Sequence, residues 1–220
     1  MKRALPLCLA LALVLVLTAC GSNAGQSGTG SDSAPGVDAP VSAAPETSPV
    51  NQPNEPDAGG RNTLIAYFSA TNNTENIANH LESILDADLY EIVPETPYTS
   101  DDLNYSDSSS RTSQEMGDPD ARPAVSGTVE NMEQYEVIFL GYPIWWGEAP
   151  RIINTFLESY DLDGKTIVPF CTSGSSPIGS SAANLQDLTG TAQWLEGQRF
   201  SGGASAADVQ SWVDSLNLNG

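Results

Sequence analysis

The feature that most constrains the fold is an alternation, after Asn62, between short β-rich runs and amphipathic helical stretches. This alternation is typical of a parallel sheet with helices packed on both faces. Five strands are predicted, at 63–68, 88–93, 135–140, 166–170 and 193–200, and apolar residues at helical spacing predict helices between them and at the end of the chain. The sequence therefore predicts one α/β domain over residues 61–220.

The first 19 residues have the pattern of an export signal. Lys2 and Arg3 precede an apolar run from Leu7 to Leu17, which is short for a stable membrane span. The following Leu-Thr-Ala-Cys resembles a bacterial lipobox, which implies cleavage before Cys20 and acylation of its thiol. A plain secretory signal or an amino-terminal anchor is the alternative. We expect an extracytoplasmic protein that is lipid-anchored to a bacterial membrane.

Residues 20–60 are predicted to be the lipidated Cys20 followed by a disordered tether. Residues 21–60 contain Ser, Gly, Ala, Pro and acidic residues but no aromatic residue, so they bury too little apolar surface to offset the entropy of ordering. The prolines extend the segment. It would therefore hold the domain away from the membrane.

The net charge and the number of metal-ligating residues argue against two kinds of partner, nucleic acid and a metal ion. The net charge is −20, which argues against nucleic acid because phosphates require a basic face. The acidic surface provides solubility, or it steers a basic partner. The single histidine, His80, has no spaced ligand partners, so no metal site is predicted. Cys171 is the only thiol in the domain and is expected to be buried and structural.

The first strand ends in a polar run, Ser69-Ala70-Thr71-Asn72-Asn73-Thr74, and a helix is expected to start near Glu75. A helix N-terminus carries partial positive charge and free N–H donors. The hydroxyls of Ser69, Thr71 and Thr74, with local amides, can therefore hold a phosphate monoester without Lys or Arg. An ordinary N-cap with polar neighbours is the alternative, although a cap needs only one such residue.

Two more polar or aromatic loops follow the third and fourth predicted strands. The first of them runs from Gly141 to Gly147 and contains Trp145 and Trp146, whose indoles could stack on a planar ligand. The alternative is that one indole is core and the other faces a partner. The second runs from Cys171 to Ser180, where small residues permit close backbone approach or form only a flexible turn.

The three loops together resemble those of the flavodoxin-like family. YFSATNNT (67–74) is similar to the phosphate-binding signature of flavodoxins, with Asn72 where Gly is usual; asparagine tolerates positive φ, so we expect the loop to keep its conformation. GYPIWWGEAPRIINTFLE (141–158) resembles the stretch that meets the flavin ring. The resemblance implies a three-layer sandwich with a five-stranded parallel sheet of order 2-1-3-4-5, which brings the loops together at one edge.

The same resemblance implies FMN as cofactor and a carrier of electrons that needs no catalytic residue of its own. A redox protein or a small-molecule acceptor would be its partner. Two alternatives stay open, an FMN-dependent NAD(P)H:quinone-type oxidoreductase and a cofactor-free surface lipoprotein. The implied FMN-binding residues are Ser69, Thr71, Asn72, Asn73, Thr74, Pro143, Ile144, Trp145, Trp146, Gly147, Thr172, Ser173, Gly174 and Gly179.

The long polar stretch at 94–131 is unusual for a compact α/β unit. We expect a partly ordered excursion and name it the excursion below. It could bring Tyr98, Tyr105, Arg111 and Arg122 to a ligand, and it is where a reductase would place a second pocket. We nevertheless expect these four to be solvated loop residues. Beside the tryptophan loop, Glu148 is expected to be a helix-start carboxylate and Arg151 a solvated cation.

Overall fold

The computed structural model describes residues 62–216 and 218. The predicted signal sequence, the lipidated Cys20 and the tether lie outside these residues, as does the first residue of the predicted domain. None of the helices within the described ranges is both long and apolar enough to cross a membrane.

The main sheet is parallel and has the predicted strand order. Its central strand pairs are β1 with β5 and β5 with β6, and they are paired over five and seven residues. β2 flanks β1, and both β7 and β8 pair with the outer side of β6. The strands are β1 (Thr63–Tyr67), β2 (Asp88–Glu91), β5 (Val137–Pro143), β6 (Thr166–Thr172), β7 (Gln193–Trp194) and β8 (Gln198–Phe200).

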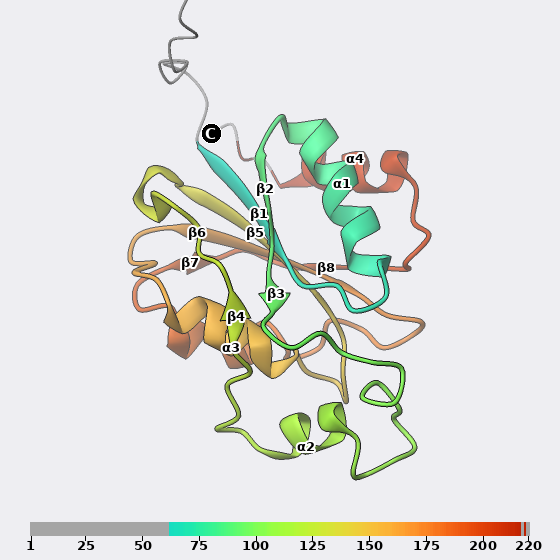
Figure 1. Cartoon of the computed structure of the whole chain (residues 1–220). Coiled ribbons are helices and arrows are strands. Elements are labelled where there is room, and N and C mark those ends of the chain that lie inside the picture. Colours follow the sequence, from blue (N-terminus) through green and yellow to red (C-terminus); the bar gives the residue numbers. More distant parts are fainter. Residues whose placement is uncertain (1–61, 217, 219–220) are drawn as a thin grey trace, which may run out of the picture. The chain divides into compact units, whose positions relative to one another are not determined.

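Helices cover both faces of this sheet (Figure 1). Alternate residues of β1 point to opposite faces, so Ile65 packs with α1 (Asn73–Leu85) and α4 (Ala206–Ser215). Leu64 and Ala66 pack on the other face, in the cluster that includes residues of α3 (Arg151–Glu158) and of the 3-10 helix η2 (Ala183–Leu188). The result is the three-layer flavodoxin-like sandwich that the sequence predicted.

Several strand boundaries differ from the prediction. The second strand ends at Glu91 rather than Val93, and the fifth is split into β7 and β8. The third and fourth run further than predicted, so Gly141–Pro143 and Cys171–Thr172 are strand residues and not loop residues. A Cβ at Gly141 would overlap the ring of Phe170, which explains why the middle of β5 carries a glycine.

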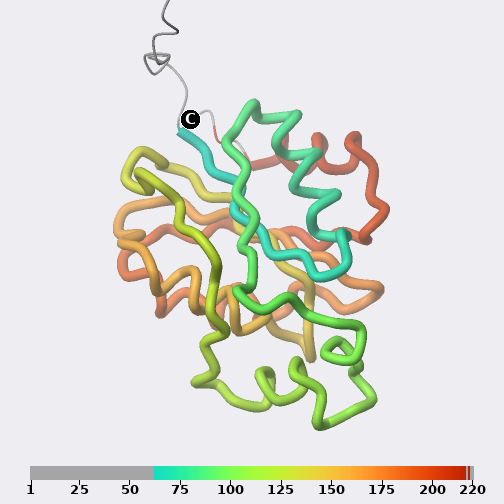
Figure 2. Tube along the Cα trace, in the orientation of Figure 1, coloured from blue at the N-terminus to red at the C-terminus, as the bar shows by residue number. Residues whose placement is uncertain are grey.

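The excursion is a folded segment with its own secondary structure. It leaves and returns through two short antiparallel strands, β3 (Val93–Pro94) and β4 (Val125–Ser126). Between them lies α2 (Arg111–Gly117), which is capped by Ser110; the Ser110 side chain accepts a hydrogen bond from the Ser113 amide. The short 3-10 helix η1 (Met132–Gln134) then leads into β5. Figure 2 shows the excursion, in green, looping away from the sheet below the ends of the strands.

Candidate functional site

The loop after β1 is shaped by a left-handed residue. Asn72 has φ 60° and immediately precedes α1, which begins at Asn73. Asparagine tolerates this conformation better than most residues, so the replacement of the usual glycine leaves the loop intact, as expected. Ser69 Oγ is buried and has no hydrogen-bond partner among the described residues. A buried hydroxyl without a partner is costly, and it is a group that a ligand oxygen could satisfy.

A buried hydrogen bond joins the start of α1 to the end of β6. Thr74 Oγ1 lies 2.8 Å from Thr172 Oγ1, and both side chains are buried. Nearby, the Asn73 side-chain amide donates to Thr71 Oγ1 at 3.0 Å, and both of these residues are exposed. Two hydroxyls of the predicted phosphate loop therefore have different roles. Thr74 fixes the loop to β6, whereas Thr71 is accessible to a ligand.

The two tryptophans have different environments. Trp145 is 3% exposed and packs edge-to-face on Phe68, with 5.5 Å between ring centroids. Trp146 is 49% exposed, adopts φ 49° and contacts Tyr105 at 5.4 Å between centroids. In a turn, the Trp145 amide donates to the Glu148 carbonyl and the Glu148 amide donates back, each at 2.9 Å. The arrangement combines one core indole with one surface indole.

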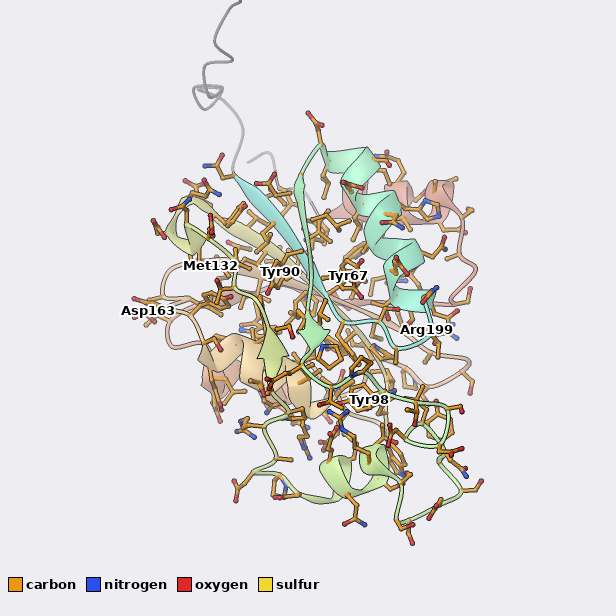
Figure 3. All side chains as sticks on the ribbon, viewed as in Figure 1. Tyr67, Tyr90, Tyr98, Met132, Asp163 and Arg199 are labelled. Atoms are coloured by element: carbon orange, nitrogen blue, oxygen red, sulfur yellow. The ribbon has the colours of Figure 1, made fainter. Side chains whose placement is uncertain are left out.

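The excursion contributes to the same site, contrary to the expectation for two of its residues. Tyr98, which is labelled in Figure 3, is half-buried. It packs on Trp145 with 5.4 Å between ring centroids, and its hydroxyl donates to Glu115 at 2.7 Å. Arg111 lies over the Tyr98 ring at 4.0 Å and pairs with Glu115. Burial, with the hydrogen bond to Glu115, raises the Tyr98 pKa. These two residues are therefore structural, because they attach α2 to the tryptophan loop.

The other predicted loop cations are also paired. Arg122 forms a bidentate ion pair with Glu158 on α3, at 2.7 and 2.8 Å. Arg151 was expected to be solvated, but its side chain is only 14% exposed; it pairs with Glu148 at 2.9 Å and donates to excursion carbonyls. Both arginines thus join the excursion to the α3 side of the sheet. Of the four named excursion residues, Tyr105 and Arg122 are exposed as expected, and Tyr105 is 68% exposed.

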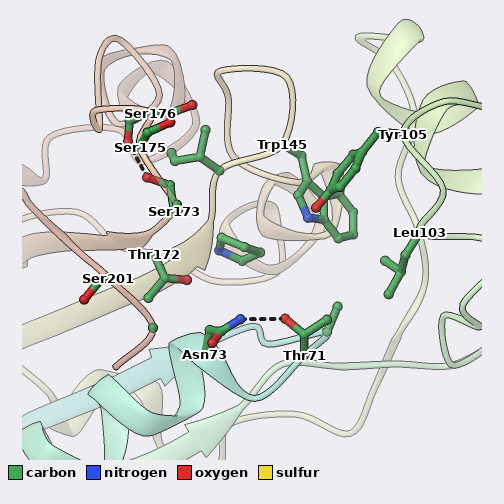
Figure 4. Close-up of a pocket in the computed structure, with 15 residues that line it drawn as sticks. Thr71, Asn73, Leu103, Tyr105, Trp145, Thr172, Ser173, Ser175, Ser176 and Ser201 are labelled. Carbon is green, nitrogen blue, oxygen red and sulfur yellow. Dashed lines mark hydrogen bonds between the residues drawn. The ribbon is translucent and has the colours of Figure 1, made fainter. Parts of the chain in front are cut away.

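These loops surround one cavity of about 410 Å³ at the carboxyl edge of the sheet (Figure 4). That position is where ligands bind in open parallel α/β sheets, and the volume is within the range of small-molecule sites. The lining residues are Ala70, Thr71, Asn73, Leu103, Tyr105, Pro143, Ile144, Trp145, Thr172, Ser173, Gly174, Ser175, Ser176, Ser201 and Gly202. We name the segment 69–74 the hydroxyl end, and Leu103, Tyr105, Ile144 and Trp145 the aromatic end.

Eight of the fourteen predicted site residues line this cavity. Thr71 and Asn73 do so from the first loop, Pro143, Ile144 and Trp145 from the second, and Thr172, Ser173 and Gly174 from the third. The other six do not line it; they are Ser69, Asn72, Thr74, Trp146, Gly147 and Gly179. Within this group, Asn72 and Thr74 shape the first loop, whereas Gly147 has φ 85° in the tryptophan turn.

Sequence reasoning missed the lining residues that come from outside the three motifs. Ser201 and Gly202 follow β8, and a Cβ at Gly202 would overlap Asn73. The rule that ligands bind beyond the carboxyl ends of strands could have indicated them, had it been applied to the fifth strand. Leu103 and Tyr105 have no such signal, because their position depends on how the excursion folds back.

The cavity contains hydroxyl and amide donors but no charged lining residue. Of the five Lys and Arg residues that the structure describes, three are in ion pairs with carboxylates. Cys171 lies on β6 next to Thr172; it is buried as expected, and burial raises its pKa to about 12, so the thiol is neutral. Within the described ranges no group of three His, Cys, Asp or Glu residues is placed to hold a metal ion.

Comparisons with known proteins agree with this geometry. Residues 62–216 match the model of a flavodoxin family. A candidate flavoprotein from Bacteroides eggerthii is 45% identical, with a TM-score of 0.68 over 72% of this chain and 99% of that one. Another from Bacteroides uniformis is 44% identical, with a TM-score of 0.67 over 71% and 99%.

A more distant structure shares the fold. It is a flavoprotein in complex with FMN from Lactobacillus acidophilus, which is 22% identical, with a TM-score of 0.53 over 70% of this chain and 99% of that one. A search of curated proteins returns no match. The family match spans nearly all the described residues, including every loop that lines the cavity. The chain therefore belongs to the flavodoxin family.

Proposed function

We propose that the chain binds FMN in this cavity and transfers electrons at the outer face of a bacterial membrane. The observation that carries the proposal is the buried Ser69 Oγ, which has no partner among the described residues and belongs to the loop that leads into α1. A phosphate monoester accepts hydrogen bonds from such a hydroxyl and from the free N–H groups of a helix start. The family relationship supports FMN as the ligand.

The hydroxyl end fits a phosphate without help from a cation. The helix that starts there is 13 residues long, so its dipole and its free amides both favour an anion. Thr71 is exposed at the cavity, while Thr74 fixes the loop through Thr172. This division lets one hydroxyl bind the ligand and another hold the loop in place.

The aromatic end fits a planar ring. Ile144 and Trp145 form an apolar wall after β5, and Leu103 and Tyr105 of the excursion also line the cavity. Bound FMN would supply reversible electron transfer, whereas these side chains would orient the ring and exclude water from one part of it. The exposed Trp146 and Tyr105 lie in contact at the surface, where a redox partner could reach them.

The location and the partner are inferred from the sequence. The lipobox-like segment that ends at Cys20 and the polar tether after it support a lipid anchor. The net charge of −20 favours a basic redox partner, since opposite charge speeds encounter at low ionic strength. Mass spectrometry of the amino-terminal peptide tests the anchor: a diacylglycerol on Cys20 supports it, and an unmodified Cys20 contradicts it.

The decisive experiment compares FMN with riboflavin, which lacks the phosphate. Ser69→Ala should weaken FMN binding about tenfold and leave riboflavin binding unchanged, because a hydrogen bond to a charged group contributes on the order of 1.5 kcal/mol. Quenching of flavin fluorescence measures both affinities. Ser83→Ala is the control, because Ser83 lies near the other end of α1 and its hydroxyl donates to the Asn79 carbonyl. Equal losses for both flavins, or no FMN binding by the wild-type chain, would contradict the proposal.

A reductase is the second candidate, and one observation favours it. Leu103 and Tyr105 give the cavity a wall from the excursion, which is the segment expected to hold a second substrate. Adding a nicotinamide donor and a quinone to the FMN-loaded chain tests this role. Steady oxidation of the nicotinamide would establish a reductase. If no oxidation occurs, electron transfer by a carrier remains the proposed function.

The cofactor-free alternative loses the feature that favoured it. That feature was Asn72 in place of glycine, and Asn72 adopts the left-handed conformation that the loop needs. A folded chain that rejects FMN in the titration above would restore this alternative.

A further inference from the structure

Arg199 is the one guanidinium among the described residues that pairs with no carboxylate. It lies on β8, and its Nη2 donates to the carbonyls of Ser173 and Gly174, each at 2.7 Å. Its Nε donates to Ser173 Oγ at 3.1 Å. The Ser173 hydroxyl in turn donates to the Ser176 carbonyl. A rigid fork of donors thus holds the start of the loop that lines the cavity after β6.

These bonds fix the direction of two peptide groups. In a trans peptide the C=O of one residue and the N–H of the next point in opposite directions. Because the carbonyls of Ser173 and Gly174 face Arg199, the N–H groups of Gly174 and Ser175 face away from it. Neither N–H has an acceptor among the described residues.

Arg199 and the cavity meet the same loop. β8 pairs with β6 on the side opposite to β5, and its Arg199 is the Cα partner of Cys171. Gly174 and Ser175 line the cavity and Arg199 does not. The guanidinium thus occupies the carbonyls of this loop, and the N–H groups on the opposite side of each peptide remain as free donors in a loop that lines the cavity.

We propose that Arg199 is a positioning residue, which holds the loop after β6 so that the N–H groups of Gly174 and Ser175 donate to an acceptor on the flavin ring. The inference rests on the proposed FMN function. The carbonyl oxygens of the ring are suitable acceptors for paired N–H donors. Arg199 acts only through the loop, and it need not touch the ligand.

The first measurement uses the full chain without flavin. Arg199→Gln keeps a polar side chain but removes the charge and the fork of donors. The NMR order parameters of Ser173–Ser176 should fall from about 0.85, typical of rigid backbone, to below about 0.6. Arg122→Gln is the matched control, because Arg122 also clamps two carbonyls, those of Pro119 and Ala121, but lines no part of this cavity. Unchanged order parameters in Arg199→Gln would overturn the proposal.

The second measurement uses FMN analogues in which sulfur, a poorer acceptor, replaces the carbonyl oxygen at ring position 2 or 4. The wild-type chain should bind one analogue about tenfold more weakly than FMN, as expected for weakening a hydrogen bond. In Arg199→Gln that discrimination should fall to about twofold or less, by the same argument. Arg199→Lys should also lose it, because a point charge cannot hold two carbonyls and a hydroxyl in one geometry. A merely structural role would weaken FMN and both analogues equally, which would overturn the proposal.

The two failures can be distinguished. If the wild-type chain binds no FMN, the proposed function fails and ring recognition fails with it, even when the order parameters show that Arg199 holds the loop. If the wild-type chain binds FMN and Arg199→Gln keeps its discrimination between FMN and the analogues, the proposed function stands and Arg199 has no part in ring recognition. A melting temperature of Arg199→Gln close to that of Arg122→Gln would show that the variant is folded.

Discussion

The two ends of the cavity are built in different ways. The hydroxyl end comes from six consecutive residues between a strand and its helix, and its conformation depends on Asn72 and on a hydrogen bond between Thr74 and Thr172. The aromatic end is assembled from two distant segments, the loop after β5 and the excursion. Tyr98 packs on both Phe68 and Trp145 and so holds these segments together.

The conformation of the hydroxyl end is set by neighbouring residues, whereas that of the aromatic end is set by contacts between residues distant in the sequence. A strand–helix junction is encoded by neighbouring residues, so it can recur in many chains with little variation. An aromatic wall made by an excursion depends on contacts between distant residues, such as Tyr98 and Trp145, which are 47 positions apart. The hydroxyl end should therefore determine affinity for the phosphate, whereas the aromatic end should determine how the ring is held.

The largest expected loss of stability comes from a substitution that disrupts the aromatic end. Tyr98→Ala removes contacts with two rings and leaves Arg111 without the ring beneath it, so the unfolding free energy should fall by about 2–4 kcal/mol. FMN and riboflavin should lose affinity equally, because both carry the ring. Tyr98→Phe is the control, since it removes only the bond to Glu115 and should cost about 1 kcal/mol. Denaturant unfolding and fluorescence titration measure these changes; a loss for FMN alone would contradict the division between the two ends.

A smaller effect is expected at the hydroxyl end. Asn72→Val places a β-branched residue at φ 60°, which should lower the unfolding free energy by about 1–2 kcal/mol. Affinity for FMN should fall more than affinity for riboflavin, since the loop that faces the phosphate is distorted. Asn72→Gly has no steric penalty at positive φ, so it should keep the wild-type affinity for both flavins. A valine variant that retains wild-type preference for FMN would show that the loop geometry does not matter.

The stability of β6, which carries Cys171 next to the cavity residue Thr172, should respond to alkaline pH. Burial raises the pKa of Cys171 from 9.0 to about 12. The thiol therefore stabilises the fold fully below pH 9, and this stability is lost as the pH rises toward 12, because only the unfolded chain ionises easily. Between pH 9 and 10, the unfolding free energy of the wild type should fall, relative to Cys171→Ala, by up to about 1.4 kcal/mol. Parallel pH dependence of the two proteins would mean that Cys171 is not sealed from solvent.

The smallest effect on stability should come from Tyr105. Tyr105→Ala removes a side chain that is 68% exposed, so the unfolding free energy should change by less than about 0.5 kcal/mol. Flavin binding should still weaken, for FMN and riboflavin alike, because Tyr105 lines the aromatic end. Comparison with Tyr98→Ala distinguishes a residue that contacts the ligand, Tyr105, from one that supports the aromatic wall, Tyr98. Unchanged binding of both flavins would remove Tyr105 from the site.

Most of the sheet could be predicted from the sequence because its strands are continuous apolar runs. The β1, β5 and β6 runs are buried on both faces, so each was visible without knowledge of its partners. Strand ends were less predictable. Gly141–Pro143 continue β5 because each has a register partner on β6, and that partner is distant in sequence.

The site could be predicted in part for the same reason. Thr71, Asn73, Trp145 and Ser173 belong to local motifs, and the structure places all four at the cavity. The excursion gave no comparable pattern. In the sequence, Tyr98 and Arg111 look like exposed loop residues. Only the fold shows that both bind the Glu115 carboxylate.

The β3–β4 pair has a consequence for how such a protein can change. Val93 lies opposite Ser126 and Pro94 opposite Val125, so the chain leaves the sheet region and returns to it at the same place. A segment with adjoining ends can be lengthened, shortened or exchanged while the strands on either side keep their pairing, because loop closure depends only weakly on length. The excursion is thus an interchangeable module, through which evolution or a protein engineer could alter the surroundings of the ring while the loop after β1 stays constant.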